Sequence, residues 1–382
     1  MMVNSLCVSA EDGHQLWLRY QPVNKAKVTT PKQTPVINMA RQELEMYYQG
    51  ESVTLKLDAS LPDGDGFSID AKGGNTTISA YQESGLLYGA YALLRQQAID
   101  PVATYKVHSN PAFALRLLNH WDNPDGSIER GYAGKSIFEW FNLDEQLIKE
   151  YARANASLGI NGSVLNNVNA SPKMLTAPYL KEVKKIADIL RHYNIKVYLS
   201  INFGTPKALN ETNTADPLDK NVVKWWQKKV KEIYKLIPDF GGFLVKANSE
   251  GQPGPGDYNR THADGANMLA DALKPFKGIV MWRCFVYGAN HKGEDRVKQA
   301  VSEFKPLDGQ FRDNVILQTK NGPLDFQPRE PDSPVFDQIK QTPNMVELQI
   351  TQEYLGQSRH LVYLAPMWKE FFPICRCLLG IM

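Results

Sequence analysis

A lysine and a glutamate stand four residues apart near the end of the segment GGFLVKANSEG, residues 241–251. The apolar half of this segment is typical of a short β-strand, which would end at Lys246 and lead into a polar turn that carries Glu250. A carboxyl group can protonate the leaving oxygen of a glycosidic bond, and a nearby cation can hold an anionic sugar. Our hypothesis from this spacing is that Glu250 is a general acid of sugar hydrolysis and that Lys246 binds an acidic substrate.

Other charged residues follow the neighbouring predicted strands. Arg283 lies in the strand expected at residues 279–285. Lys320 ends the strand expected at 314–320, with Asp325 just beyond it, and Glu353 ends the strand expected at 346–353. Hydrolysis needs a second, ionised carboxylate as nucleophile or as base for a water molecule. A nearby cation lowers a carboxyl pKa, which would spoil a general acid, so we expect the cations to face a negative group of the substrate. The pattern predicts a hydrolase of acidic sugars.

Each of these residues also has an ordinary structural interpretation. Glu250 could be a solvated loop residue, and the cations could simply neutralise the three carboxylates in a structural network. Trp121, at the end of the first strand of this series, could belong to the core, and Asp325 could cap the segment that follows it. The functional interpretation depends on all of them lying on one rim of the fold.

The elements that would position these side chains alternate along the chain after residue 111. Short apolar segments are separated by amphipathic segments with helical periodicity, which is the pattern of a parallel β/α fold. Seven such repeats predict an α/β (β/α)8 TIM-type barrel, whose chemistry collects at the carboxyl ends of the strands. The expected strands are residues 115–121, 163–169, 196–202, 242–248, 279–285, 314–320 and 346–353. The expected helices are residues 144–158, 179–192, 221–236, 263–273, 295–304 and a short one within 333–341.

The two ends of the chain differ from this repeat. Residues 11–105 predict an α+β accessory domain with strands at 15–20 and 52–58, a hairpin around Gly73-Gly74-Asn75 and a helix at 85–97. The barrel domain would span residues 111–370. Residues 371–382 form an atypical apolar tail that does not match an eighth repeat, so we expect the barrel to be incomplete at its C-terminus.

Composition excludes several classes of protein. A net charge of +2 without a basic run argues against nucleic-acid binding, and no apolar run of 18 residues exists to span a membrane. Of the four cysteines, Cys284 falls in a strand, and the pair Cys375 and Cys377 has no second Cys/His pair, so no metal site is expected. Val8-Ser9-Ala10 is similar to the end of a secretory leader, which suggests a secreted or periplasmic protein; the alternative is a cytoplasmic one.

Five motifs resemble glycoside hydrolase family 67, the α-glucuronidases. The likeness extends over about residues 11–370, and its motifs are long and ordered. They are RLLNHWDNPDGSIERGYAGKSIF (116–138), LGINGSVLNNVNA (158–170), FLVKANSEGQPGP (243–255), FRDNVILQTKNGPLDFQPREP (311–331) and ELQITQEYLGQ (347–357).

The resemblance implies removal of 4-O-methylglucuronic acid, α-1,2-linked to the terminal xylose of glucuronoxylan-derived oligosaccharides, with inversion and without a metal or cofactor. It implies that Glu250 is the general acid and that Asp325 and Glu353 are the pair that supplies the base. Inversion requires the acid and base carboxyl groups to lie roughly 6.5–9.5 Å apart.

The resemblance also implies how the substrate is held. Lys246, Arg283 and Lys320 match positions that bind the uronic carboxylate. Trp121 matches an aromatic residue that shapes the sugar subsite, and Val168 matches an apolar contact to the 4-O-methyl group.

Members of this family continue into a large helical domain that contributes to the rim of the site and to dimerisation. This domain is missing from the sequence, so we expect a monomer. A chain of this extent could also be a catalytically impaired fragment or a non-catalytic binder of acidic xylo-oligosaccharides. A hydrolase of another acidic sugar, such as a galacturonide, is a further alternative.

Overall fold

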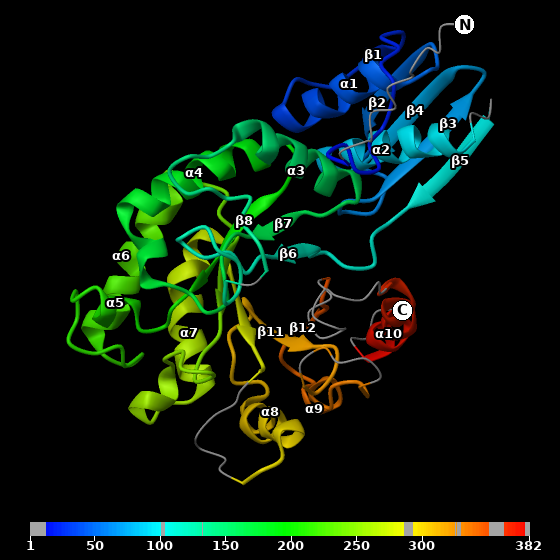
Figure 1. Cartoon of the computed structure of the whole chain (residues 1–382). Coiled ribbons are helices and arrows are strands. Elements are labelled where there is room, and N and C mark those ends of the chain that lie inside the picture. Colours follow the sequence, from blue (N-terminus) through cyan, green and yellow to red (C-terminus); the bar gives the residue numbers. More distant parts are fainter. Residues whose placement is uncertain are drawn as a thin grey trace, which may run out of the picture. The chain divides into compact units, whose positions relative to one another are not determined.

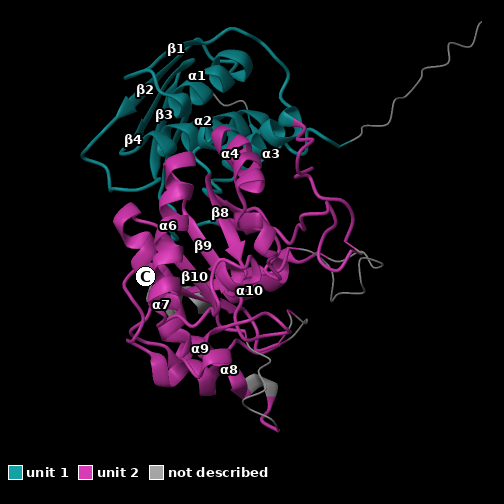
Figure 2. Ribbon diagram, turned by 90° about the vertical axis from the view of Figure 1, so that its left-hand side faces the viewer, with its two compact units in different colours: residues 1–116, 145–161, 189–195 teal, residues 117–144, 162–188, 196–382 magenta. Residues whose placement is uncertain are grey.

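The computed structural model of the chain describes residues 13–100, 104–131, 133–285, 293–324, 326, 330–350 and 363–378. The chain folds into two compact units (Figure 2). The first comprises residues 1–116, 145–161 and 189–195, and the second comprises residues 117–144, 162–188 and 196–382. Within the described residues, no helix is long and apolar enough to cross a membrane.

The first unit contains a five-stranded mixed sheet. Its strands are β1 (Lys27–Thr29), β2 (Ser52–Leu57), β3 (Phe67–Lys72), β4 (Asn75–Ala80) and β5 (Thr104–Ser109), in the order β1-β2-β4-β3-β5. The strands β1, β2 and β4 are parallel, whereas β3 runs antiparallel to β4 and β5. Gly73 and Gly74 connect β3 to β4 with φ of +58° and +83°, as a tight two-residue hairpin requires, which confirms the predicted hairpin.

Three helices complete this unit: α1 (Pro35–Tyr47), α2 (Glu83–Ile99) and α3 (Glu145–Ser157). The predicted apolar face of the helix over 85–97 is buried in α2, and α2 joins α1 and the sheet in one apolar core. Helix α1 was missed from the sequence, although Thr34 caps its amino end and Pro35 opens its first turn.

The strand expected at residues 15–20 is wrong. Hydrogen bonds from Leu16 N to Gly13 O and from Leu18 N to Gln15 O form turns there, and Leu16 has a φ of +54°. Of the apolar side chains in this segment, Leu18 is buried, whereas Leu16 and Trp17 are exposed. The strand-like composition of this segment therefore does not produce a strand, because the segment buries little apolar surface.

The second unit contains seven parallel strands that curl into a half-barrel (Figure 1). Each strand pairs with the next one in the sequence, so the spatial order follows the chain order, as predicted for β/α repeats. The strands are β6 (Leu117–Asn119), β7 (Gly162–Val164), β8 (Lys196–Ile201), β9 (Gly242–Val245), β10 (Ile279–Arg283), β11 (Val315–Lys320) and β12 (Asn344–Glu347).

Helices connect the strands at the predicted places. They are α4 (Ala177–Arg191), α5 (Thr205–Ala208), α6 (Lys220–Leu236), α7 (His262–Leu273), α8 (Arg296–Phe304) and α9 (Val335–Gln338), and α10 (Ala365–Leu378) follows β12. The strongly amphipathic α6 illustrates the reason: Asp219 caps its amino end, and its apolar face, which includes Trp226 and Val230, is buried. Helices α5 and α10 were not predicted from the sequence. Helix α10 extends past residue 371, where the atypical tail was expected to begin.

The alternation of side chains along the parallel strands positions the residues of the site. Tyr198, Leu244 and Met281 belong to one buried apolar cluster inside the curled sheet. Side chains two residues apart on a strand share a face, so Arg283 continues the line of Met281 toward the carboxyl end of the sheet. Lys246 follows Leu244 at the same spacing, just after β9 ends.

Glycine at position 242 permits the close approach of β9 to β10. Gly242 has a φ of +137°, and a Cβ atom built there would lie 2.0 Å from the carbonyl oxygen of Ile279. Only glycine combines this backbone conformation with this spacing. The strand that leads to Lys246 and Glu250 therefore depends on glycine at its start.

Candidate active site

The predicted site residues that the structure describes gather at the carboxyl ends of the parallel strands. Arg283 and Lys320 are the last residues of β10 and β11, and Lys246 follows β9 directly. Trp121 lies two residues beyond β6, and Val168 lies four residues beyond β7. Asp325 and Glu353 lie outside the described residues, so the predicted separation of the acid and base carboxyl groups falls outside them as well.

Lys246 is buried, with 1% of its surface exposed, and its ammonium group has two acceptors. It donates to Asn169 Oδ1 at 2.8 Å and forms an ion pair with Glu250 Oε2. Burial lowers the pKa of Lys246 and the positive charge of Arg283 adds to the lowering, whereas Glu250 and Glu129 oppose it. The cation of the predicted substrate site therefore neutralises the predicted general acid in this structure.

Glu250 sits on a tight turn with an uncommon backbone conformation. Both Asn248 and Glu250 have positive φ, at +51° and +49°, and Gly251 follows at +80°. The turn is closed by a hydrogen bond from Gln252 N to Ser249 O. A glutamate at positive φ is unfavourable unless its surroundings impose it, and such strain is concentrated at functional sites.

The side chain of Asn248 fixes this turn to the segment that follows it. Asn248 Nδ2 donates to Asp257 Oδ1 at 3.0 Å, and its Oδ1 accepts from Gly256 N at 2.8 Å. Asp257 in turn accepts from Gly254 N at 3.0 Å. These bonds hold the backbone that presents Glu250, which is why a polar, glycine-bearing sequence follows the strand.

A second carboxylate, Glu129, lies in the electrostatic environment of Lys246 and Glu250. It is buried, it has a φ of +54°, and Arg130 Nε lies 3.3 Å from its Oε1. Burial raises the pKa of Glu129 and Glu250 raises it further, whereas Arg130 and Lys246 lower it. The exposed side chain of Arg130 also reaches Glu250 Oε1 at 3.5 Å. Sequence reasoning missed Glu129 because it lies in the loop after β6, several residues beyond the strand end.

Arg283 forms a buried, bidentate ion pair with a carboxylate that sequence reasoning also missed. Its Nε and Nη2 donate to Glu347 at distances of 2.9–3.1 Å. Glu347 ends β12 and is the register partner of Lys320 on β11. A charged residue between Val346 and Leu348, within a segment predicted to be a strand, was the signal that could have identified it.

Lys320 lies over aromatic rings. Its Nζ is 3.1 Å from the centroid of the Phe285 ring and 4.7 Å from that of Phe326. The Arg283 guanidinium carbon lies 5.8 Å from the centroids of both Phe285 and Trp121. Both predicted cations therefore share a cation–π contact with Phe285, and Arg283 also contacts the predicted aromatic residue Trp121.

Trp121 and Val168 belong to the same apolar cluster under this site. Val168 is fully buried in it, and the partly buried Trp121 packs against it. Part of Trp121 therefore belongs to the core, as its structural interpretation expected. Its contact with Arg283 also places it beside the charged groups.

Asparagine side chains form the rim of the site beyond β7. Asn166 exchanges hydrogen bonds with the backbone of Ser200, which replaces part of the strand ladder. Asn167 donates to Asn123 Oδ1 at 3.0 Å, and Asn169 accepts from Lys246. Asn169 therefore positions Lys246, whereas Asn166 and Asn167 fix the backbone and the neighbouring side chains of the rim.

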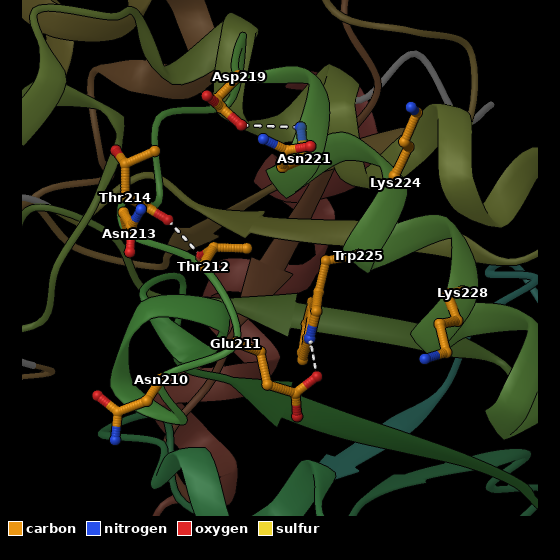
Figure 3. A pocket seen from close by; sticks show the side chains of 10 residues that line it. All are labelled: Asn210, Glu211, Thr212, Asn213, Thr214, Asp219, Asn221, Lys224, Trp225 and Lys228. Carbon is orange, nitrogen blue, oxygen red and sulfur yellow. Dashed lines mark hydrogen bonds between the residues drawn. The ribbon is translucent and has the colours of Figure 1, made fainter.

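No group of three or more potential metal ligands (His, Cys, Asp or Glu) occurs among the described residues. A polar surface pocket of about 520 Å³ is lined by residues of α6 and of the loop before it (Figure 3). Its side chains make their own contacts, such as the 2.6 Å hydrogen bond from Trp225 Nε1 to Glu211. It is lined by Asn210, Glu211, Thr212, Asn213, Thr214, Asp219, Asn221, Lys224, Trp225 and Lys228. None of the predicted site residues lines it.

The strand-end arrangement combines three buried cations, an acid on a strained turn and an aromatic surface. Buried cations can receive an anionic group because its charge offsets their loss of hydration. A half-exposed carboxyl group next to them can exchange protons with solvent and with a ligand. The geometry is therefore suited to acid-catalysed cleavage of a negatively charged substrate.

Comparison with known proteins agrees with this chemistry. The family model of the glycosyl hydrolase family 67 middle domain matches residues 95–376. A probable α-glucuronidase A of Aspergillus clavatus is 43% identical over 406 residues, covering 94% of this chain and 48% of that protein. The α-glucuronidase A of Emericella nidulans is also 43% identical, covering 94% of this chain and 49% of that protein. The chain spans about half the length of these curated relatives.

Solved structures share the fold at low sequence identity. A GH138 enzyme that targets pectin rhamnogalacturonan II has a TM-score of 0.56 and 17% identity, covering 86% of this chain and 42% of that one. The GH20 β-N-acetylhexosaminidase of Streptomyces coelicolor has a TM-score of 0.51 and 12% identity, covering 86% and 73%. These likenesses concern the fold alone. The match to the middle-domain model and the identity to the curated relatives together show that this chain belongs to glycoside hydrolase family 67.

Proposed function

We propose that this chain carries the catalytic site of an α-glucuronidase that removes (4-O-methyl-)glucuronic acid, α-1,2-linked to xylose, from glucuronoxylan-derived oligosaccharides. The names of the curated relatives support the activity. The observation that carries the proposal is the position of Lys246, Arg283 and Lys320, which are all at least 97% buried at neighbouring strand ends. Carboxylates of the protein pair with Lys246 and Arg283, and a uronate would be a further anion that meets this concentration of buried positive charge.

In this proposal the three cations receive the uronic carboxylate, and Trp121 and Val168 form the apolar side of the sugar subsite. Glu347 accepts from Nε and Nη2 of Arg283, so the remaining donors of the guanidinium group are the ones that would face the uronate. The partly buried ring of Trp121 supports this role, because such a surface can pack against a pyranose ring.

The proposed reaction inverts the anomeric configuration. Glu250 protonates the glycosidic oxygen as the bond between that oxygen and the anomeric carbon breaks. Asp325 and Glu353 supply the base that removes a proton from the attacking water on the opposite side. The location of Glu250 at the carboxyl end of the sheet, on a turn held by Asn248, supports its role.

We further propose that the seven strands belong to a (β/α)8 barrel and that residues 11–105 form a separate non-catalytic domain. The sequential, parallel order of β6 to β12 supports the barrel, since this winding is the one that closes into a cylinder. The carboxyl-end position of the site residues supports it as well.

The test is hydrolysis of an aldouronic oligosaccharide, followed by chromatography of the released uronic acid and proton NMR of the first anomer formed. We expect release of the β-anomer by the chain and a loss of about 10²–10⁴-fold in kcat for Glu250→Gln. A thermal melt and calorimetric titration with D-glucuronate show whether the variant folds and binds. Unchanged hydrolysis by Glu250→Gln contradicts the acid role, and a folded chain that binds no glucuronate contradicts the substrate class.

A further inference from the structure

The ion pair between Lys246 and Glu250 conflicts with the role of Glu250 as an acid. A general acid must carry a proton, whereas a bound ammonium group stabilises the ionised carboxylate. In the structure, Lys246 contacts Glu250 and has its second acceptor in Asn169. This ion pair therefore favours the form of Glu250 that cannot protonate a leaving group.

Lys246 cannot leave Glu250 without a replacement. Its ammonium group is buried at the end of β9, and a buried cation that loses its charged partner is strongly destabilised. Asn169 offers a neutral oxygen at 2.8 Å and no compensating charge. A second anion inside the site is therefore the partner that would release Glu250.

The other cations are less suited to exchange partners. Arg283 is held by Glu347 through three contacts, with both side chains buried, so its carboxylate partner is fixed. Lys320 lies over the rings of Phe285 and Phe326. Glu250 differs from Glu347 because 32% of its side chain is exposed and it is carried by a turn rather than by a strand.

The groups around Glu250 favour protonation once Lys246 has left. Arg130 reaches it at 3.5 Å, but 65% of the Arg130 side chain is exposed, so water and salt weaken this attraction. Glu129 is buried, and its negative charge repels that of Glu250, as the raised pKa of Glu129 shows. The charged groups around Glu250 therefore include one internal cation, one exposed cation and one buried carboxylate.

We propose that Lys246 changes partner during the reaction: it is paired with Glu250 in the free protein and transfers to the uronate when the substrate binds, so that Glu250 takes up the proton it later donates. This inference rests on the proposed function. The proton comes from solvent, passes to the glycosidic oxygen as the carbon–oxygen bond breaks, and leaves with the xylose hydroxyl group. Glu250 is then ionised again and recovers Lys246 when the uronic acid departs.

Because of the partner exchange, the site would favour a uronate over a neutral sugar in the chemical step as well as in binding. A neutral glucoside has the same ring but no carboxylate, so it would leave Lys246 on Glu250 and the acid ionised. Discrimination would then appear in kcat as well as in binding, because the substrate's charge completes the catalytic group. Binding of the uronate thus leads to protonation of Glu250, the acid that cleaves the glycosidic bond of the same substrate.

Calorimetric titration tests the exchange without depending on hydrolysis. D-Glucuronate is titrated into the chain in buffers of different ionisation enthalpy, and the slope of the observed enthalpy gives the protons taken up. We expect uptake of up to about one proton per bound glucuronate in at least part of a series of titrations at different pH values, because the uronate takes the cation that stabilises ionised Glu250. D-Glucose, which matches the ring without the charge, should bind without proton uptake.

The variant Glu250→Gln tests whether Glu250 is the group that takes up the proton when glucuronate binds. It keeps the size of the side chain and removes its titration, so proton uptake should disappear while glucuronate still binds; a thermal melt confirms that the variant folds. Binding without uptake by the wild-type chain, or unchanged uptake by Glu250→Gln, overturns the exchange and leaves the proposed function standing. A folded chain without glucuronate binding overturns the proposed substrate class and the exchange together.

Discussion

Arg283 and Glu347 form a bidentate ion pair between the ends of β10 and β12, with 2% and 7% of their side chains exposed. The strand β11 lies between them in the sheet order, so the pair spans a neighbouring strand. It connects the carboxyl ends of the strands that carry the proposed uronate site.

Breaking this pair should destabilise the second unit. The variant Glu347→Gln leaves the Arg283 guanidinium buried without a counter-charge, and we expect a loss of about 3–5 kcal/mol in the free energy of unfolding, measured by urea titration. The matched control is Asp271→Asn, which breaks the exposed pair between Arg312 Nε and Asp271 Oδ1 at 2.9 Å and should cost no more than about 1 kcal/mol. Equal losses in the two variants would show that burial of the Arg283 pair has no special weight.

Gly242 should tolerate no side chain. Gly242→Ala places a Cβ atom 2.0 Å from the Ile279 carbonyl oxygen and forces a φ of +137° on a non-glycine residue, so we expect unfolding at lower denaturant. The control Gly126→Ala also has a positive φ, +82°, but its Cβ would meet no atom within 4 Å. Backbone strain alone should cost about 1–2 kcal/mol, and the Gly242 variant should lose more. A smaller loss at position 242 than at position 126 would contradict the close approach of β9 and β10.

Asn248 should act on the rate rather than on substrate binding. Asn248→Ala removes the bonds to Gly256 and Asp257 that hold the turn of Glu250, and a displacement of about 1 Å can cost roughly 10²-fold in rate. We expect kcat to fall and KM to change little, as measured by steady-state kinetics on an aldouronic oligosaccharide. The control Asn259→Ala removes another asparagine at positive φ, +55°, and should leave kcat near the wild-type value. An effect on KM alone would assign Asn248 to substrate binding.

Glu129 should give the stability a pH dependence. Because burial raises the pKa of folded Glu129 above its unfolded value, the folded protein binds more protons between these two pKa values. Stability is then greatest below the unfolded pKa and falls as pH rises through the folded pKa. Glu129→Gln cannot ionise, so its free energy of unfolding should rise relative to that of the wild type as the pH increases from the unfolded pKa of glutamate toward the higher folded pKa of Glu129. Urea titrations of both proteins at several pH values measure this difference, and a difference that stays constant with pH contradicts it.

Much of the second unit could be predicted because its signals are local. Strands such as GFLV are short apolar runs followed by polar turns, and helices such as α6 have a clear amphipathic period. The order of the strands followed from the alternation of the two patterns. Lys246 and Arg283 were found because residues at the ends of parallel strands must meet at one edge.

The contacts that were missed depend on residues distant in the sequence. Nothing local shows that Glu347 faces Arg283, since their 64-residue separation is bridged only when β10, β11 and β12 pair in register. Glu129 enters the site through a loop that folds back on the end of β6, where its backbone N donates to Trp121 O at 2.8 Å. The segment 15–20 was mistaken for a strand because its composition suits a sheet in which it finds no partner.

The positive φ of Glu250 has a consequence for any attempt to improve this protein by selection for heat resistance. Asparagine and glycine occupy this backbone region more easily than glutamate, so replacing Glu250 by either relieves backbone strain. The same replacement leaves the buried ammonium group of Lys246 without its charged partner, which costs more than the strain that is relieved. A screen for heat resistance should therefore retain glutamate at this position, although its backbone conformation alone would favour a different residue.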